Sequence, residues 1–131
     1  MSLGDNKLSG VIPEEIGEMS SLEYLYLFNN ELVGTIPASI GSLSNLKHIG
    51  LWDNKLSGEI PDDLQACQHL KLIWLNNNHL SGSIPPWLGT LHQLEYLYLS
   101  GNQDIVGEIP EELGKLQALQ SLHISGTSVK G

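Results

Sequence analysis

A period of 24 residues is the feature that most constrains how this chain can fold. Asparagine recurs at a constant spacing of 24 residues, at Asn6, Asn30, Asn54, Asn78 and Asn102. One extra residue in the next stretch places Thr127 at the following slot, 25 residues after Asn102. Leucine or isoleucine stands at fixed offsets from each asparagine. A fixed period in the twenties predicts a solenoid, in which each repeat forms one coil and buries its apolar residues against its neighbours.

Each repeat shares one frame, which in the second copy consists of Leu22, Leu25, Leu27, Asn30, Leu32, Gly34, Ile36 and Pro37. The alternation around Leu25 and Leu27 is typical of a short strand with its leucines inward and the other residues outward. Strands one repeat apart are expected to stack as a parallel sheet. Each asparagine then stands where the chain leaves the sheet, so its amide is expected to bond unpaired backbone groups in a buried ladder.

Glycine and proline recur in columns of their own. One glycine column predicts positive φ or a close approach of two coils, and contains Gly10, Gly34, Gly58, Gly82, Gly107 and Gly131. A proline column predicts the start of a short helical turn on the far side of each coil, at Pro13, Pro37, Pro61, Pro85 and Pro110. The acidic pairs after three of these prolines, such as Glu14 and Glu15, suit the first turn of a helix and not a catalytic site.

The motif Asn-x-Leu-Ser-Gly-x-Ile-Pro, as in residues 54–61, resembles the plant-type leucine-rich repeat, and the resemblance covers essentially the whole chain. That family includes ectodomains of receptor-like kinases, receptor-like proteins and polygalacturonase-inhibitor-like proteins. The resemblance implies an α/β class fold: a right-handed curved superhelix with a concave parallel sheet, a second short strand and short helical or 3₁₀ segments on the convex side. We expect residues 1–131 to form a single domain of about five repeats, without the cysteine caps usual in the family.

Seven of the eight aromatic residues fall at positions that the frame turns toward the concave face. The fold does not require aromatic residues there, so an exposed cluster of them favours a binding surface over simple cross-strand packing. Trp87 is the exception, and it either packs on Pro86 or marks a lateral contact. The predicted partner-binding residues are Tyr24, Tyr26, Phe28, His48, Gly50, Trp52, Asp53, Trp74, Asn76, Tyr96 and Tyr98.

Two of these residues carry more specific expectations. Gly50 stands between Tyr26 and Trp74 in one column, so it predicts a notch that a partner group enters, or simply a glycine tolerated within a strand. Asp53 is expected to pair with a cation of the partner at the edge of the aromatic patch. Trp52 and Trp74 are expected to carry most of the binding energy, since tryptophan dominates interface hot spots.

Composition excludes several other classes of function. Fifteen acidic residues against six lysines give a net charge of −9, which argues against nucleic-acid and anionic-membrane contacts. No catalytic triad, phosphate-binding loop or metal-ligand spacing is present, so neither an enzyme nor a cofactor is expected. The single cysteine, Cys67, occupies a leucine slot and is expected to be a buried thiol.

The sequence therefore predicts a protein- or peptide-binding module that uses a concave aromatic face. The alternatives are a stand-alone intracellular scaffold, a self-associating structural protein whose coils stack end to end, and a polygalacturonase-inhibitor-like protein. The resemblance implies an extracellular or plasma-membrane ectodomain. A cytoplasmic setting stays open, because neither a signal peptide nor an Asn-x-Ser/Thr glycosylation site is found.

Overall fold

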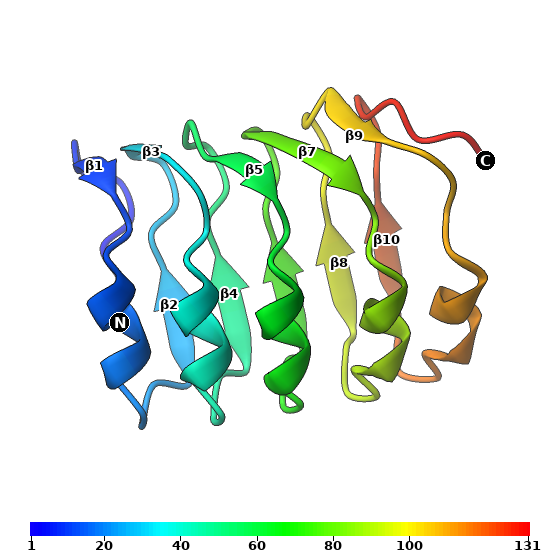
Figure 1. Ribbon diagram of the computed structural model, residues 1–131, viewed down its shortest axis with the longest axis horizontal. Helices are drawn as coiled ribbons and strands as arrows, with labels where there is room; N and C mark the ends of the chain where they lie inside the picture. The colour runs from blue at the N-terminus through cyan, green and yellow to red at the C-terminus, as the bar shows by residue number, and fades with distance from the viewer.

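The computed structural model describes residues 1–131 as a row of similar coils (Figure 1). Each coil between the first and the last runs from a strand of the main sheet through a lateral strand to a short 3₁₀ helix. The elements in chain order are β1 (Ser9–Val11), η1 (Glu14–Glu18), β2 (Tyr24–Tyr26), β3 (Glu31–Val33), η2 (Ala38–Ser42), β4 (His48–Gly50), β5 (Ser57–Glu59), η3 (Asp62–Ala66), β6 (Leu72–Trp74), β7 (His79–Ser83), η4 (Pro86–Thr90), β8 (Tyr96–Tyr98), β9 (Asp104–Val106), η5 (Glu111–Lys115) and β10 (Ser121–His123). The structure thus confirms the predicted leucine-rich repeat solenoid with parallel strands and short 3₁₀ segments.

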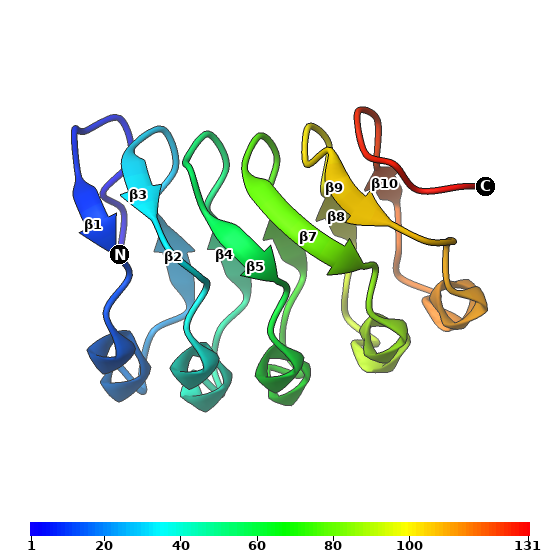
Figure 2. The same ribbon diagram turned by 45° about the horizontal axis from the view of Figure 1, so that its top comes forward.

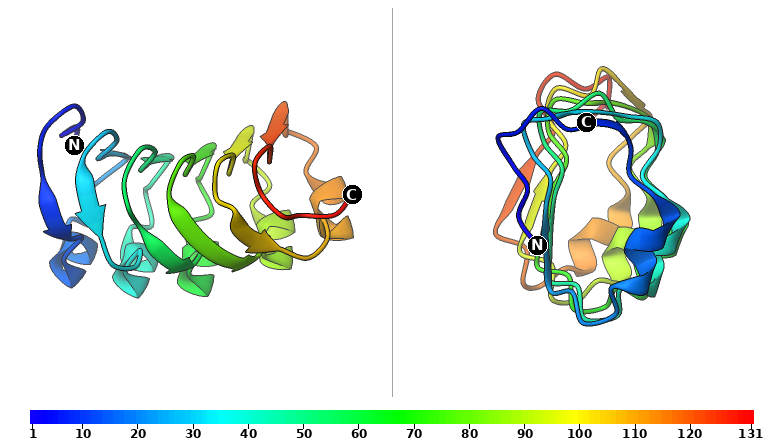
Figure 3. Two further views of the ribbon diagram at one scale, coloured as in Figure 1. Left: turned by 90° about the horizontal axis from the view of Figure 1, so that it is seen from above. Right: turned by 90° about the vertical axis from the view of Figure 1, so that its left-hand side faces the viewer.

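The main sheet has five parallel strands in the order β2, β4, β6, β8 and β10. Its register follows the repeat, so that Leu25 pairs with Ile49, Ile49 with Ile73, and Ile73 with Leu97. Seen from above, the row of coils bends gently, with the five-stranded sheet on the inner side of the bend (Figure 3, left). We call the outward side of this sheet the concave face.

The second short strand that the family resemblance implied is present in every coil but the last, where an isolated bridge joins Glu108 and Lys130. The second strands form a two-stranded sheet of β1 and β3 and a three-stranded sheet of β5, β7 and β9, all parallel. These lateral strands cross the coils obliquely at the side of the molecule (Figure 2). The glycine column lies here, and Gly10, Gly34, Gly58, Gly82 and Gly107 have φ between 77° and 85°, as their pattern predicted.

The 3₁₀ helices stack along the convex side, and their start differs by one residue from the prediction. Pro13, Pro37, Pro61, Pro85 and Pro110 are extended N-cap residues that precede the helices, which begin at the next residue. A second glycine column, at Gly17, Gly41, Gly89 and Gly114, lies within the 3₁₀ helices, and three of its members lie close to the next coil. A Cβ at Gly17 would lie 2.6 Å from the Ser39 carbonyl oxygen, so these three glycines allow neighbouring helices to approach closely.

Gln65 of η3 stands where the other helices have this column's glycine. The next helix, η4, contains Trp87, the one aromatic residue outside the concave face. Trp87 of η4 is half-buried against the core, and its Nε1 donates to Asp62 Oδ1 of η3 at 2.8 Å. The side chain therefore joins the two coils that lack the close glycine contact, through a bond to Asp62 that neither alternative from the sequence had named.

Leucine and isoleucine columns fill the inside of the coils, which appear as one closed cross-section when viewed along the row (Figure 3, right). The predicted asparagine ladder is confirmed at the four inner repeats. Asn54, for example, donates to the Leu27 and Leu51 carbonyls at 2.9 and 3.1 Å and accepts from Leu32 N at 3.1 Å.

Cys67 is fully buried in its leucine slot, where Sγ lies 3.3 Å from the Ile40 carbonyl oxygen. Burial raises the pKa of this thiol to about 11.

Candidate functional site

The predicted columns lie side by side on the concave face. The register pairs Tyr24 with His48, His48 with Leu72, and Leu72 with Tyr96 in one column. In the next, Tyr26 pairs with Gly50, Gly50 with Trp74, and Trp74 with Tyr98. The core residues between them, such as Ile49 and Ile73, point inward and are fully buried. Alternation along each strand therefore directs the predicted site residues to one surface.

The aromatic rings of this surface touch one another across all five strands. The ring centroids are 4.1 Å apart for Phe28 and Trp52, and 4.0 Å apart for Trp52 and Trp74. Tyr98 follows at 5.3 Å from Trp74 and His123 at 4.6 Å from Tyr98. We call this continuous row of five rings the aromatic strip.

Phe28, Trp52 and Trp74 stack on each other and so do not offer flat faces to a ligand, whereas Tyr98 stands edge-on to Trp74 at 80°. Phe28 and Trp52 are inclined by only 2°, and Trp52 and Trp74 by 20°. Stacking hides the ring faces between neighbours and leaves the ring edges at the surface. Because edges carry the positive part of the aromatic quadrupole, they favour electron-rich groups such as carbonyl oxygens. The aromatic residues of the strip are partly exposed.

Gly50 does not form the predicted notch, and this prediction was wrong. Gly50 is buried, and a Cβ built there would lie 2.6 Å from Trp52 Cζ3 and 2.6 Å from Tyr26 Cδ1. The rings on either side lean over the glycine and occupy the space that a partner was expected to enter. Gly50 thus permits the packing of the strip and is not itself accessible to a ligand.

A second aromatic group, made of Tyr24, Tyr26 and His48, lies beside the strip. The Tyr26 hydroxyl and His48 Nδ1 form a hydrogen bond of 2.5 Å, and the Tyr24 ring stands edge-on to the His48 ring at 4.9 Å. Burial lowers the pKa of His48 below its usual value, and the nearby Lys71 adds to this effect. Burial also raises the pKa of Tyr26. Both side chains are therefore held in their neutral forms at neutral pH.

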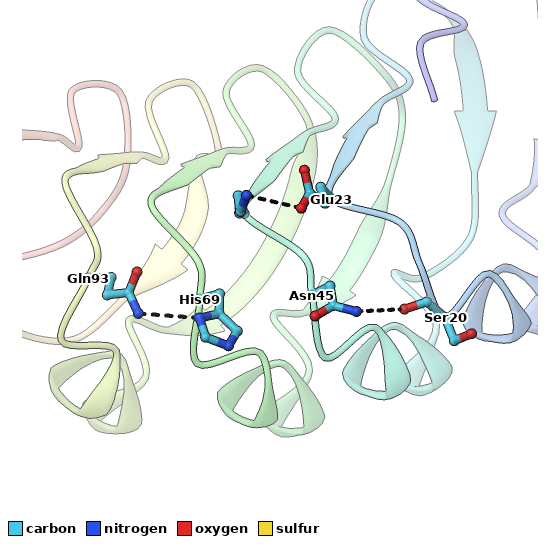
Figure 4. A network of polar contacts seen from close by, with 6 residues as sticks. Ser20, Glu23, Asn45, His69 and Gln93 are labelled. Atoms are coloured by element: carbon cyan, nitrogen blue, oxygen red, sulfur yellow. Dashed lines mark hydrogen bonds and ion pairs between the residues drawn. The ribbon is translucent and has the colours of Figure 1, made fainter.

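Charged and amide side chains border the aromatic residues on the side of the 3₁₀ helices. Glu23 and Lys47 form an ion pair of 3.0 Å between neighbouring coils, and Asn45 Nδ2 donates to the Ser20 carbonyl (Figure 4). Lys71, one coil further along, forms no ion pair. These contacts join successive coils, so the border holds the concave face in register.

Two buried polar atoms on β6 and just after it have no hydrogen-bond partner. They are Nε1 of Trp74, a donor, and Oδ1 of Asn76, an acceptor. Trp74 and Asn76 are two residues apart and lie on the same face of the sheet. Because an unpaired buried donor or acceptor costs about 1–3 kcal/mol, these two atoms are the polar groups of this face that gain most from a partner.

Asp53 belongs to a column whose backbone requirement the sequence analysis missed. Asp5, Asn29, Asp53 and Asn77 all have φ between 52° and 56°, and Gly101 and Gly126 continue the column at 79° and 70°. Asparagine, aspartate and glycine tolerate this left-handed conformation best, and their recurrence after each strand was the available signal. Asp53 is exposed, and its Oδ1 already accepts a bond of 2.7 Å from Asn77 Nδ2.

Family models described as leucine-rich repeat match residues 44–103 and, in a second model, residues 21–43 and 93–116. The comparison with curated proteins found no significant match. No helix of the chain is long and apolar enough to cross a membrane.

This chain is strongly similar to solved structures of plant receptors. The plant peptide hormone receptor RGFR1, solved in complex with RGF2, is 44% identical over 96% of this chain, with a TM-score of 0.94. The chain spans about a fifth of that receptor's length, since it covers 20% of it. A chain of the BIR3–SERK2 complex from Arabidopsis thaliana is 37% identical, with a TM-score of 0.89, and this chain covers 69% of it. The ectodomain of the receptor kinase SOBIR1 from Arabidopsis thaliana is 32% identical, with a TM-score of 0.93, and this chain covers 71% of it. The matches to the BIR3–SERK2 chain and to SOBIR1 each include the whole of this chain.

Proposed function

This chain belongs to the plant-type leucine-rich repeat family, and we propose that it binds a peptide or an extended protein segment across the aromatic strip. Its relatives include a plant peptide hormone receptor solved in complex with RGF2 and a chain of the BIR3–SERK2 complex. The partner is therefore expected to be a protein or a peptide. Because receptor ectodomains face outward, we place this chain outside the cell or at its surface.

The observation that carries the proposal is the unbroken row of aromatic rings over the five strands. Centroid distances of 4.0–5.3 Å join Phe28 to His123, although the core of the fold needs none of these side chains. Partly exposed aromatic residues in a contiguous patch are characteristic of binding surfaces. Trp52 and Trp74 stand at the middle of the row, where contacts contribute most to affinity.

The polar atoms at the centre of the strip suit a peptide partner. One peptide group supplies both a carbonyl acceptor and an N–H donor. The unpaired Trp74 Nε1 and Asn76 Oδ1 are a donor and an acceptor of the matching kinds. The edges of the stacked rings also attract carbonyl oxygens. The neutral forms of His48 and Tyr26 complete a surface that discriminates by shape and hydrogen bonding more than by charge.

Selection of binders from a phage-displayed library of random dodecapeptides tests this function. We expect the enriched peptides to lose at least about 30-fold in affinity for Trp52→Ala and Trp74→Ala, the loss typical of a hot spot of about 2 kcal/mol. Glu14→Ala and Glu111→Ala, in the first turns of η1 and η5, are the controls and should leave affinity unchanged. The absence of enrichment would contradict the proposal, as would peptides that respond to the controls and not to the tryptophan variants.

A further inference from the structure

A polar pocket of about 320 Å³ opens at one edge of the concave face, between the turns that follow β6 and β8. None of its lining residues is hydrophobic, and none is a lysine; they are Asn77, Asn78, His79, Gly101, Gln103 and Asp104. Asn77 directly follows Asn76 of the predicted binding surface, so a peptide lying across the aromatic strip reaches the pocket with one side chain.

The pocket exists because a column of side chains stops at this point. In the first four coils this column consists of Asp5, Asn29, Asp53 and Asn77, and it carries two side-chain hydrogen bonds of 2.7 Å between neighbouring coils. Glycine takes the position in the next coil, at Gly101. The same coil has the one extra residue of the repeat, beside Asp104. A missing side chain and a longer turn together leave the opening.

Oxygen acceptors and negative charge gather in the pocket. The Asn77 side-chain amide donates through Nδ2 to Asp53, and this bond directs the Asn77 Oδ1 toward Gly101. A Cβ added at Gly101 would collide with the Asn77 Oδ1. Asp104 contributes an exposed carboxylate to the lining. Asp104 is the one acidic residue of the lining, in a chain whose net charge is −9, and no lysine of the lining opposes it.

We infer that this pocket binds a basic side chain of the partner peptide, an inference that rests on the proposed function. A guanidinium group offers five N–H donors in one plane and an ammonium group offers three, and both bond strongly to a carboxylate and an amide oxygen. A bound metal ion fits less well, because hard cations prefer several carboxylates and the lining has one. A sugar fits less well because no tryptophan, tyrosine or phenylalanine lines the pocket for stacking.

An NMR titration of the ¹⁵N-labelled chain with N-acetyl-arginine amide tests the inference. We expect saturable shifts of the Gly101 backbone amide and of the Asn77 and Gln103 side-chain amides. N-acetyl-lysine amide should shift the same signals, whereas the uncharged N-acetyl-citrulline amide should leave them in place. Asp104→Asn should weaken the binding of the arginine probe by about tenfold or more, since a charge-assisted bond is lost. Asp63→Asn on η3 is the matched control and should change nothing.

Three results would overturn the inference: no saturable shift with either cationic probe, equal shifts with citrulline, or binding unaffected by Asp104→Asn. Saturable shifts of the same signals with methyl glucoside alone would assign the pocket to a sugar instead. These probes make no use of the aromatic strip. Failure here therefore leaves the peptide-binding proposal to be judged by the Trp52 and Trp74 variants.

Discussion

Replacing Asn54 by alanine should show how much the buried asparagine ladder contributes to stability. Asn54 is 7% exposed and links two coils through three short hydrogen bonds. Its Nδ2 donates to the Leu27 and Leu51 carbonyls, and its Oδ1 accepts from the buried Leu32 N–H. The alanine variant removes these three bonds and a longer one of 3.4 Å from Nδ2 to the Trp52 carbonyl, while it replaces no side chain of the concave face.

The structure allows the cost to be estimated bond by bond. The Leu27 and Leu51 carbonyls keep a second partner, in Asn30 and Asn78 respectively, so each lost bond there costs about 1 kcal/mol. The Leu32 N–H has no other partner and is left buried and unpaired, at about 1–3 kcal/mol. The total is about 3–5 kcal/mol, which corresponds to a fall of roughly 10 °C or more in Tm for a chain of this size.

Urea unfolding followed by circular dichroism measures this difference, with Asn6→Ala as the matched control. Asn6 occupies the same slot in the first coil but is exposed, and it bonds only to the Leu3 and Gly4 carbonyls. Water can replace those bonds, so the control should lose less than about 1 kcal/mol. Equal losses for the two variants would refute the reasoning that burial makes the inner asparagines essential.

Three further predictions concern single side chains. Gly50→Leu should destabilise the protein by about 1–3 kcal/mol, because even a Cβ there meets the Tyr26 and Trp52 rings at 2.6 Å; unchanged urea unfolding would show that the rings give way freely. Cys67 should resist Ellman's reagent at pH 8 until denaturant is added, because the thiol is buried and its pKa is raised to about 11; reaction at the rate of a free thiol would contradict its placement. Stability should fall as pH drops through about 6.5, because burial lowers the pKa of His48 and the unfolded chain therefore takes up the proton first. A His48→Gln variant should show a shallower fall in stability. Identical pH profiles of the two proteins would show that His48 does not cause this effect.

The repeat frame predicted which residues of neighbouring coils pair and which inward slots are apolar or asparagine, although the left-handed column that contains Asp53 was missed. The fixed spacing placed Tyr24 and His48, and Trp74 and Tyr98, in neighbouring pairs, because a parallel register carries a sequence period directly into columns. The asparagine ladder followed for a similar reason. A polar side chain repeated at an inward slot must find backbone partners there.

Side-chain direction within the columns could not be predicted from the frame. The notch at Gly50 assumed rings that stand apart, whereas Tyr26 and Trp52 lean over the glycine and Trp52 stacks on Trp74 from a different column. Which rings stack depends on rotamers chosen by all neighbours together, and a repeat frame does not encode these. The polar pocket also escaped prediction, because it results from an absent side chain at Gly101 and not from a motif.

Tryptophan fluorescence offers the most direct test of the claim that the aromatic strip binds the partner. The chain has three tryptophans, two in the strip and one, Trp87, on η4. A Trp87→Phe variant reports only on the strip, and a Trp52→Phe/Trp74→Phe double variant reports only on η4. Titration with a peptide selected from the dodecapeptide library should change the emission of the first variant in a saturable way and leave that of the second unchanged. A change confined to the Trp87 signal would contradict the account, because it would place the bound peptide on the helical side of the solenoid.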